Sequence, residues 1–599
     1  MERCGKFGPL LGVISVGNVY CKFLVYAARN AEILTCHEIK LKQIIPQPGW
    51  LEFDPNELWA NVVECMEVSC RNLIILDIDP GDILAVGISN QRGSCLLWNK
   101  RTGNPLCNII AWTDTRTSSV VKNLLSSLRG KINYLKSVCG LPISTCFSAI
   151  KLKWLQENVP SINQGLYDRN CCFGTLDSWI LWNLTGGTDE GKHATDVTNA
   201  AYTMLMNLEQ RTWDPKLCAF FQTPSYVLPE IKSCSEIYGF VRDGPLRGVP
   251  IASIMGDQPA ALLGQLCIKP QKGTCTLDEG CYILFNTGQE IIDSDNGLLS
   301  TVAFQLGSKQ KTFYCLEGAV PNAGAAVTWL KESLYLNVEL KESNESSGIF
   351  NTFAGNSTMA SSDYSSPVFA NSSTGEPTAV ATANAKRGDV VFVPAFSGLY
   401  SPFWKHDARG LLLGINSNTT SENIFHAAYE ATCYQARDLL HSFHCDTKTW
   451  TPLTKLIVGG EFSENAYLLQ LLADITGLVI ERPQTTSPSC LGVMLAAGTA
   501  VGVISLENSL SMYIPPSDIF HPTTTINRRE ILHRRWEYAI KKCINWDNFE
   551  NFDEELATFT QQEKNPYLSV HNSIPGGLFL TTSFVLLIIA RFLQSSNIS

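Results

Sequence analysis

The sequence has few charged residues and no excess of positive charge. Asp, Glu, Lys and Arg make up only 17% of the 599 residues, and 46 basic side chains against 56 acidic ones give a formal net charge of −10. Nucleic-acid binding needs clustered Lys and Arg that neutralise phosphates, so this balance argues against nucleic-acid partners. Because 45% of the residues are apolar, we expect most of the chain to bury a core rather than to stay disordered.

The 21 cysteines lack the spacing of a zinc site or of a disulfide framework. Their number is odd, their intervals are irregular, and no Cys-x-x-Cys pair occurs. The first nine residues also lack the apolar stretch of a signal peptide. We therefore expect reduced thiols in a protein that faces the cytosol.

What the sequence does contain is an alternation of short apolar runs and helical patterns. A chain of this length exceeds one ordinary core and predicts two domains with additions. Thr419 and Glu422 have the spacing of a capping box, which predicts a helix after them, and 148–157 also has helical spacing. Strands are predicted at 10–16, 22–26, 83–89, 390–393 and 456–458. Strands that alternate with helices indicate an α/β protein.

Two segments stand outside this pattern. Residues 342–386 are rich in Ser, Thr, Asn, Ala and Gly, which predicts a flexible surface insertion. After a polar linker at 547–573, residues 574–590 carry no charge, and as a helix they would span roughly 25 Å, slightly less than the ~30 Å of a hydrocarbon core. We interpret 574–593 as a membrane tail, with a packed terminal helix as the alternative.

Single residues give weaker indications of chemistry. Asp257 lies between an apolar run and a helical pattern, where a carboxylate could act as a general base on a hydroxyl or could simply cap the helix. Arg92 follows an apolar strand and could bind a hydroxyl or phosphate, or pair on the surface. Trp112 could form an apolar wall of a site or belong to the core.

The order of several motifs is more specific. Phe-Gly-Thr-Leu-Asp-Ser-Trp at 173–179, Thr-Asp-Val-Thr-Asn-Ala at 195–200 and Gly-Asp-Gln at 256–258 resemble the glycerol kinases, members of the sugar-kinase family with the actin-like ATPase fold. Leu-Glu-Gly-Ala-Val at 316–320 and the signature at 410–430 extend the resemblance, which runs from about residue 10 to residue 546. It implies two actin-like (ribonuclease H-like) domains, at 10–265 on the substrate side and 266–546 on the nucleotide side, with an interdomain cleft.

The resemblance also implies roles for particular residues. The aspartate that matches Asp257 accepts the proton of a glycerol hydroxyl as this attacks the γ-phosphoryl group of MgATP. The positions that match the family's glycerol contacts are Arg92, Trp112, Cys146, Asp257, Gln258 and Tyr282. Those that match its nucleotide contacts are Gly17, Asn18, Lys22, Glu279, Gly280, Gly324, Glu461 and Asn465.

The nucleotide loops depart from the family pattern. The family's Asp-Gln-Gly-Thr begins here with Ser15, so the metal-directing aspartate is missing. The second loop, Tyr-Gly-Thr-Gly in the family, contains Asp278 and Glu279, and the third, Asp-Gly-Gly, ends in Glu461. An acid about 5 Å from a phosphate charge costs roughly 3 kcal/mol at an effective dielectric constant of about 20. Asp278 could instead take over the magnesium ion.

The glycerol side has changed as well. The family's Arg-Glu pair reads Arg92-Gly93, and the family's tyrosine is Cys146, so hydroxyl partners are lost. We therefore expect a glycerol-kinase-family protein, using ATP and Mg²⁺ to make sn-glycerol 3-phosphate, whose activity is weak or lost. The alternative is a pseudokinase that serves as a binding or scaffold protein, and a kinase for another polyol is less favoured.

Partners and location follow from the same resemblance. Glycerol or a similar polyol is the expected small molecule, nucleic acid is not expected, and a homo-oligomer is compatible with the sequence. Animal glycerol kinases have a similar apolar tail that attaches them to the mitochondrial outer membrane. The resemblance thus implies that membrane, facing the cytosol, with a cytoplasmic location as the alternative.

Overall fold

The computed structural model describes residues 6–336, 389–448, 450–484, 487–506, 513, 516–546 and 591. The predicted insertion at 342–386 and the linker at 547–573 lie outside these residues, and so does the predicted tail at 574–593 apart from Arg591. Within the described ranges, no helix combines the length and apolarity needed to cross a membrane.

The first half of the chain is built on a six-stranded sheet in the order β13-β14-β5-β1-β2-β3. Strands β1, β2 and β3 form an antiparallel meander, and β5 and β14 run parallel to β1. The bounds are β1 Leu10–Val16, β2 Tyr20–Ala27, β3 Glu32–Lys40, β5 Ile83–Asn90, β13 Ser235–Phe240 and β14 Pro250–Gly256. Leu10 and Ile14 belong to one apolar core and Leu11 and Val13 to another, so both faces of β1 are covered and the strand is a continuous apolar run.

Smaller elements complete this half. A four-stranded sheet has the order β4-β7-β6-β8, with β4 Glu52–Phe53, β6 Cys95–Asn99, β7 Ile109–Ile110 and β8 Cys171–Thr175. Helix α1, Pro55–Ile75, begins after Asp54, whose carboxylate accepts from the N–H groups of Asn56 and Glu57. The other helices are α2 Ser118–Ser127, α3 Lys136–Cys139, α4 Ser148–Asn158, α5 Pro160–Tyr167, α6 Leu176–Leu184, α7 Val197–Ala201 and α8 Pro215–Phe220.

The second half repeats this arrangement, although the sequence shows no internal repeat. Its seven-stranded sheet has the order β17-β18-β16-β15-β21-β22-β23, in which β15, β16 and β18 are antiparallel neighbours and β21 and β22 run parallel to β15. The bounds are β15 Gly273–Leu277, β16 Cys281–Gly288, β17 Leu299–Gln305, β18 Thr312–Val320, β21 Lys455–Gly459, β22 Val479–Pro483 and β23 Ser517–Phe520. The helices around it are α10 Gly324–Glu332, α11 Ser421–Asp446, α12 Ala466–Thr476 and α15 Ile526–Cys543.

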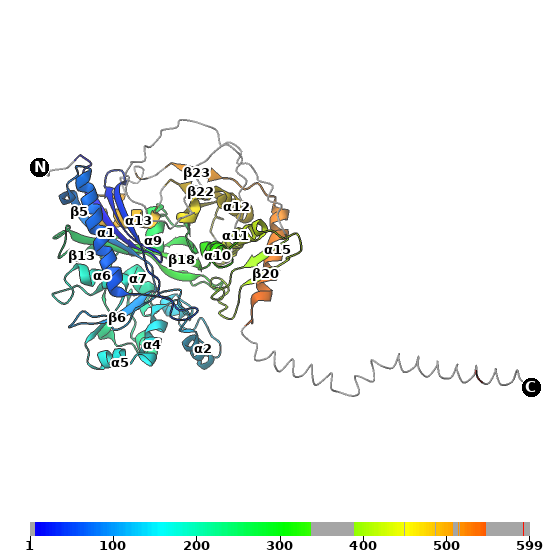
Figure 1. Cartoon of the computed structure of the whole chain (residues 1–599), viewed down its shortest axis with the longest axis horizontal. Helices are drawn as coiled ribbons and strands as arrows, with labels where there is room; N and C mark the ends of the chain where they lie inside the picture. Colours follow the sequence, from blue (N-terminus) through cyan, green and yellow to red (C-terminus); the bar gives the residue numbers. More distant parts are fainter. Residues whose placement is uncertain are drawn as a thin grey trace, which may run out of the picture.

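Two helices join the halves (Figure 1). Helix α9, Asp257–Gly264, crosses α13, Pro488–Ala500, where a Cβ on Gly264 would lie 1.9 Å from the carbonyl oxygen of Pro488. A Cβ on Gly492 would lie 1.9 Å from the carbonyl oxygen of Ala260, so only glycine permits this approach. Helix α13 then packs on the first sheet, with Val493 against Gly87. The C-terminal half of the chain thus supplies a helix to the N-terminal sheet.

The predicted elements are present, with one correction. The predicted strands correspond to β1, β2, β5, β21 and to β19 Val391–Val393, and the predicted helix at 148–157 corresponds to α4. The capping box is formed by Thr420 and Asn423 rather than by Thr419 and Glu422. Thr420 has the extended backbone that a capping residue needs, and its N–H donates to the Asn423 side chain at 3.0 Å. Helix α11 therefore begins at Ser421.

Candidate functional site

The predicted substrate residue Arg92 is held by an ion pair between the two halves of the chain. It follows β5, and its two terminal nitrogens donate to the carboxylate of Glu317 on β18 at 3.0 and 2.5 Å. Thr301 donates to the same carboxylate at 3.0 Å, and the guanidinium lies 4.3 Å from the ring centre of Tyr202. Burial opposes the charge on Arg92, but the Glu317 carboxylate raises its pKa above the usual value. The orientation of Arg92 is therefore fixed.

Asp257 lies beside this pair, as the first residue of α9. Its carboxylate accepts from the N–H of Gln258 at 2.8 Å and lies 3.8 Å from Nε of Arg92. Burial raises the pKa of Asp257 to about 6, although Arg92 opposes the shift. Its side chain still keeps 31% of its surface exposed, so a small molecule can reach it. At neutral pH it is a carboxylate that can accept a proton.

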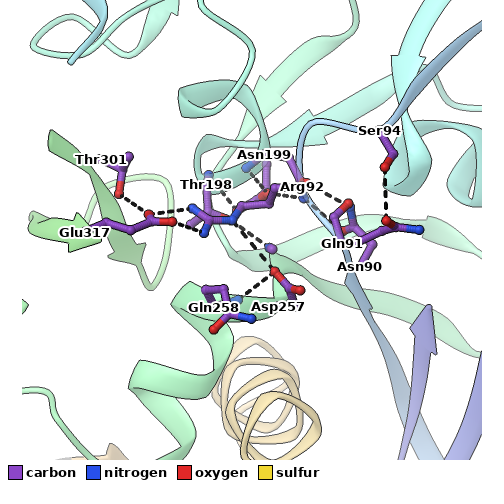
Figure 2. A network of polar contacts seen from close by, with 12 residues as sticks. Asn90, Gln91, Arg92, Ser94, Thr198, Asn199, Asp257, Gln258, Thr301 and Glu317 are labelled. Atoms are coloured by element: carbon purple, nitrogen blue, oxygen red, sulfur yellow. Dashed lines mark hydrogen bonds and ion pairs between the residues drawn. The ribbon is translucent and has the colours of Figure 1, made fainter. Parts of the chain in front are cut away.

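Buried polar groups hold the junction between β14 and α9 in place. Gly256, which precedes the helix, donates its N–H to the hydroxyl of Thr198 at 2.8 Å, and that hydroxyl donates to Asp196 at 2.7 Å. Asn199 and Asn90 exchange amide hydrogen bonds of 2.8 and 3.0 Å. Figure 2 shows how this network and the Arg92–Glu317 pair converge on Asp257.

Two buried polar atoms near Asp257 have no hydrogen-bond partner among the described residues. They are Nε of Arg92, a donor, and Oε1 of Gln258, an acceptor. Buried polar groups are normally paired, so an unpaired donor and acceptor beside a reachable carboxylate are suited to a ligand that offers both functions. A hydroxyl group both accepts and donates, so this arrangement fits a small polyol.

The other predicted substrate residues are Trp112, Tyr282 and Cys146. The rings of Trp112 and Tyr282 meet edge to face with centres 5.9 Å apart, and Ser94 accepts from the N–H of Trp112 at 3.0 Å. Cys146 is buried, with its sulfur 3.2 Å from the hydroxyl oxygen of Ser144.

Cys146 also lies against the glycine that follows Arg92. Gly93 has a φ of +78°, and a Cβ there would lie 2.6 Å from the carbonyl oxygen of Cys146. The buried ammonium of Lys151 donates to that same carbonyl at 2.6 Å and holds it in place. The two departures on the glycerol side are thus in contact.

The altered residues on the nucleotide side also contact one another. Asn18, in the turn between β1 and β2, donates to Glu279 at 2.7 Å, and Lys22 on β2 lies 3.5 Å from Glu461. The N–H of Glu461 donates to Asp278 at 2.8 Å. Asn18 and Lys22 belong to the first half of the chain, and the three acids lie in loops of the second half. These contacts therefore bridge the two halves. Burial raises the pKa of Asp278 to about 7 and also raises that of Glu279.

The remaining predicted nucleotide residues have structural contacts in the described part of the chain. Gly17 donates its N–H to the carbonyl of Tyr20 at 3.0 Å, and Asn465 caps α12 by accepting from the N–H of Leu468 at 3.2 Å. A Cβ on Gly324 would lie 2.4 Å from the ring of Phe462, and one on Gly280 would lie 2.7 Å from the hydroxyl of Tyr282.

The nucleotide side does not fit MgATP as it stands. The carboxylates of Glu279 and Glu461 are bound to the residues expected to contact phosphate, and they add negative charge to that region. Ser15 offers no carboxylate, and one oxygen of Asp278 is already bound to a backbone N–H. The described residues contain no group of three or more side chains suited to a metal ion.

Sequence reasoning missed Glu317 as a site residue. The signal was available, because a glutamate within the otherwise apolar strand β18 must have a partner if it is buried. The identity of that partner, Arg92, could not be read from residues 225 positions apart. Tyr202, whose ring packs on Arg92, carried no signal of its own.

A separate cavity of about 600 Å³ lies between the end of α9 and strands β15 and β21. Gln265, Lys269, Lys455 and Pro488 line it, and none of the predicted site residues does. The cavity is therefore distinct from the region around Asp257.

Comparisons with known proteins agree on one family. The chain matches the FGGY family of carbohydrate kinases, with the N-terminal domain at 10–264 and the C-terminal domain at 273–501. It is 35% identical to a "Probable glycerol kinase" of Dictyostelium discoideum, over 91% of this chain and 100% of that protein. It is 36% identical to a glycerol kinase of Saccharopolyspora erythraea, over 86% of this chain and 95% of that protein.

Solved structures give the same result for the fold. A crystal structure of Plasmodium falciparum glycerol kinase with ADP superimposes with a TM-score of 0.72 and 29% identity, covering 89% of this chain and 98% of that one. A gluconate kinase from Lactobacillus acidophilus has a TM-score of 0.67 at 19% identity, covering 91% and 98%. The second likeness concerns the fold alone.

Proposed function

Because the chain belongs to the FGGY family of carbohydrate kinases and has the two-domain, actin-like ATPase fold of that family, we propose that it is a glycerol-kinase-type protein that binds glycerol beside Asp257. The family reaction transfers the γ-phosphoryl group of ATP to glycerol and gives sn-glycerol 3-phosphate and ADP. In this chain that transfer is weak or lost, because the nucleotide loops are altered. The relatives named above as glycerol kinases support the choice of substrate.

The proposal that glycerol binds here rests on two atoms beside Asp257, Nε of Arg92 and Oε1 of Gln258, that have no hydrogen-bond partner among the described residues. One hydroxyl of glycerol accepts from Nε of Arg92 and donates to the Asp257 carboxylate, and a second donates to Oε1 of Gln258. Glu317 fixes Arg92, and Trp112 and Tyr282 shield the carbon chain from water. Asp257 then takes the proton that the reacting hydroxyl loses. The protein assists this transfer mainly by positioning the reacting hydroxyl.

Isothermal titration of the full-length protein with glycerol tests this proposal. Gln258→Leu removes the unpaired acceptor, so we expect glycerol affinity to fall by roughly ten-fold for one lost hydrogen bond. Gln265→Leu is the matched control, because the Gln265 amide is equally buried and unpaired but lines the separate cavity. Equal glycerol affinity in wild type and Gln258→Leu would contradict the proposed site.

A second candidate function is supported by the contacts between Asn18 and Glu279 and between Lys22 and Glu461. Side chains that bind each other across the nucleotide region favour a pseudokinase, a binding or scaffold protein that keeps the fold without efficient phosphoryl transfer. Titration with MgATP separates the two functions. Affinity in the millimolar range or better would contradict the pseudokinase.

A third candidate, a kinase for another polyol, is supported by Gly93 and Cys146. These residues replace a carboxylate and a phenol of the family's glycerol site, so the preference for glycerol over longer polyols should be relaxed. A competition titration of glycerol against four- and five-carbon polyols would reveal this. Strong selectivity for glycerol would remove this candidate.

The location of the protein is part of the proposal. The uncharged segment at 574–590 suits a tail in the mitochondrial outer membrane that leaves both domains in the cytosol, and a cytoplasmic protein is the alternative. Residues 574–593 fused to a fluorescent protein should label mitochondria. Labelling of the endoplasmic reticulum would keep the anchor and change the address, whereas a diffuse signal would exclude the tail.

A further inference from the structure

Helix α15 has two faces of different chemistry. Leu532, Trp536, Ala539 and Cys543 are buried and belong to the core of the second half. The opposite face points away from both sheets, on the outer edge of the second half (Figure 1). Ile531 and Tyr538 lie near the middle of this outer face and are 55% and 59% exposed. The outer face of α15 therefore exposes two large side chains, Ile531 and Tyr538, to water.

Helix α15 is also strongly basic. Six of the eighteen residues of α15 are Arg or Lys and two are Glu, a formal charge of +4 within a chain of −10. Both acids pair with other residues, Glu530 with Arg437 at 2.6 Å and Glu537 with His533 at 3.5 Å. They stand one helical turn before Arg534 and Lys541, but no ion pair between these side chains occurs among the described residues.

Most of these cations have no partner within the described part of the chain. Arg535 pairs with Asp389 at 3.4 Å, but no hydrogen bond or ion pair involves the side chains of Arg528, Arg534 and Lys541. Lys542 contacts only the ring of Tyr538, 5.4 Å from its centre. All four of these side chains belong to exposed residues.

We propose that this basic face of α15, centred on Ile531, Arg534, Tyr538 and Lys541, docks on the surface of an anionic phospholipid bilayer. Cations interleaved with exposed aliphatic and aromatic side chains are the pattern of a helix that lies at a membrane interface. Trp546, 48% exposed just beyond the helix, adds a side chain that favours the interface. Nucleic acid would use the cations but leave Ile531 without a partner.

The position of the helix in the chain supports a lipid partner. The 27 residues 547–573 separate Trp546 from the uncharged segment proposed as a tail, and a chain of that length reaches at most roughly 100 Å. If the tail enters a bilayer, α15 is held within reach of the same surface. The docking proposal uses the tail only for this tethering, since the charge and exposure of α15 hold without it.

Vesicle flotation of the full-length protein tests the proposal. Binding is compared on phosphatidylcholine vesicles and on vesicles that also contain phosphatidylserine, for the wild type and for the triple variant Arg534→Gln, Lys541→Gln, Lys542→Gln. Each cation near an anionic surface contributes about five-fold to partitioning, so the triple variant should lose on the order of 100-fold on the anionic vesicles. Its binding to neutral vesicles should not change. High salt should reproduce the loss in the wild type.

Matched controls separate docking from total charge and from the tail. Arg101→Gln, Lys131→Gln, Lys309→Gln changes the net charge equally at exposed positions elsewhere and should bind like the wild type. The tail at 574–593 carries a single charge, Arg591, which every variant retains, so the tail cannot produce a difference between the triple variant and the wild type. Ile531→Ser with Tyr538→Ser should weaken binding without changing its salt dependence. Unaltered thermal unfolding of all variants shows that folding is intact.

Two outcomes would overturn the proposal. One is a triple variant that binds anionic vesicles as strongly as the wild type. The other is a wild type that ignores both kinds of vesicle but binds duplex DNA through the same three side chains, which would assign the face to a nucleic acid.

Discussion

At the scale of single residues, the pair of Arg92 and Glu317 does more than position a ligand. Both side chains are buried, and they come from different halves of the chain. Removal of one member leaves an uncompensated buried charge, which typically costs about 3–5 kcal/mol. Arg92→Ala should therefore lower the free energy of unfolding by that amount, in addition to weakening glycerol binding.

The paired substitution separates stability from binding. Arg92→Met combined with Glu317→Leu removes both charges and fills most of the space, so it should recover much of the stability that Arg92→Ala loses. Glycerol affinity should stay low in both variants, because Nε of Arg92 is absent from each. Urea unfolding and glycerol titration measure the two quantities. An Arg92→Ala protein as stable as the wild type would show that Glu317 finds another partner.

The pKa of Asp257 sets a pH dependence. Burial raises this pKa to about 6, so the group is protonated below that pH and cannot accept the proton of a substrate hydroxyl. Glycerol affinity and any turnover should therefore rise as the pH increases through 6 and should level off above 7. Asp257→Asn should abolish this dependence and lower turnover by roughly 100-fold or more. A variant that keeps the wild-type profile would point to a different base or to a contaminating kinase.

At the scale of elements, the sequence was most informative where local chemistry decides the structure. Strands such as β1 and β5 are largely apolar because helices cover both faces of their sheet. An apolar run of this length in the sequence therefore predicts such a strand directly. The start of α11 was misplaced by one residue, because Thr419 and Thr420 are adjacent candidates and only the backbone angles distinguish them.

The candidate site was predictable only in part, for the same physical reason. Asp257 and Arg92 each follow an apolar strand, a local feature that gave only a weak indication, and their roles were predicted from the resemblance to the glycerol kinases. The contact between Asn18 and Glu279 joins residues 261 positions apart, and no local pattern encodes it. The sequence predicted repulsion between the acids and a nucleotide, but it did not predict that basic and amide side chains of the opposite half would bind those acids.

The loop after β5 gives a prediction at this scale. Gly93 has a positive φ and lies against the carbonyl oxygen of Cys146, so Gly93→Ala should lower the free energy of unfolding by about 1–3 kcal/mol. Gly17→Ala is the matched control, because φ there is not positive and the added Cβ would have a single contact, at 3.6 Å. Urea unfolding compares the two. Equal stability of both variants would mean that the loop adapts, and that the family's glutamate could be restored at position 93.

At the scale of the whole molecule, the contacts across the nucleotide side link the two halves without a ligand. In a two-domain kinase the nucleotide normally supplies such a link, and closure then follows binding. Here Asn18 and Lys22 of the first half already bind Glu279 and Glu461 of the second. These contacts are few and partly exposed, so they connect the loops of the two halves without contributing much to overall stability.

Restoring the family loops should break the contacts between the two halves and should raise the affinity for MgATP. The variant Ser15→Asp, Asp278→Gly, Glu279→Thr, Glu461→Gly removes three acids, returns a metal-directing carboxylate and breaks both bridges. Removal of even one repulsion of roughly 3 kcal/mol should raise MgATP affinity by about two orders of magnitude. Without nucleotide, small-angle scattering should show a larger radius of gyration, which MgATP should reduce. Single reversions should do little, because the loops act on one ligand and their effects are coupled.

Asn18→Ala with Lys22→Ala is the control for this experiment, since it breaks the same bridges but leaves the acids in place. That variant should show the same increase in radius of gyration, which would attribute the increase to loss of the bridges rather than to removal of the acids. If the quadruple variant folds and opens but binds no MgATP, charge is not what excludes the nucleotide. The obstacle would then be steric. The bulky side chains of Val19, in the turn between β1 and β2, and Tyr20, the first residue of β2, would be the next to replace with serine.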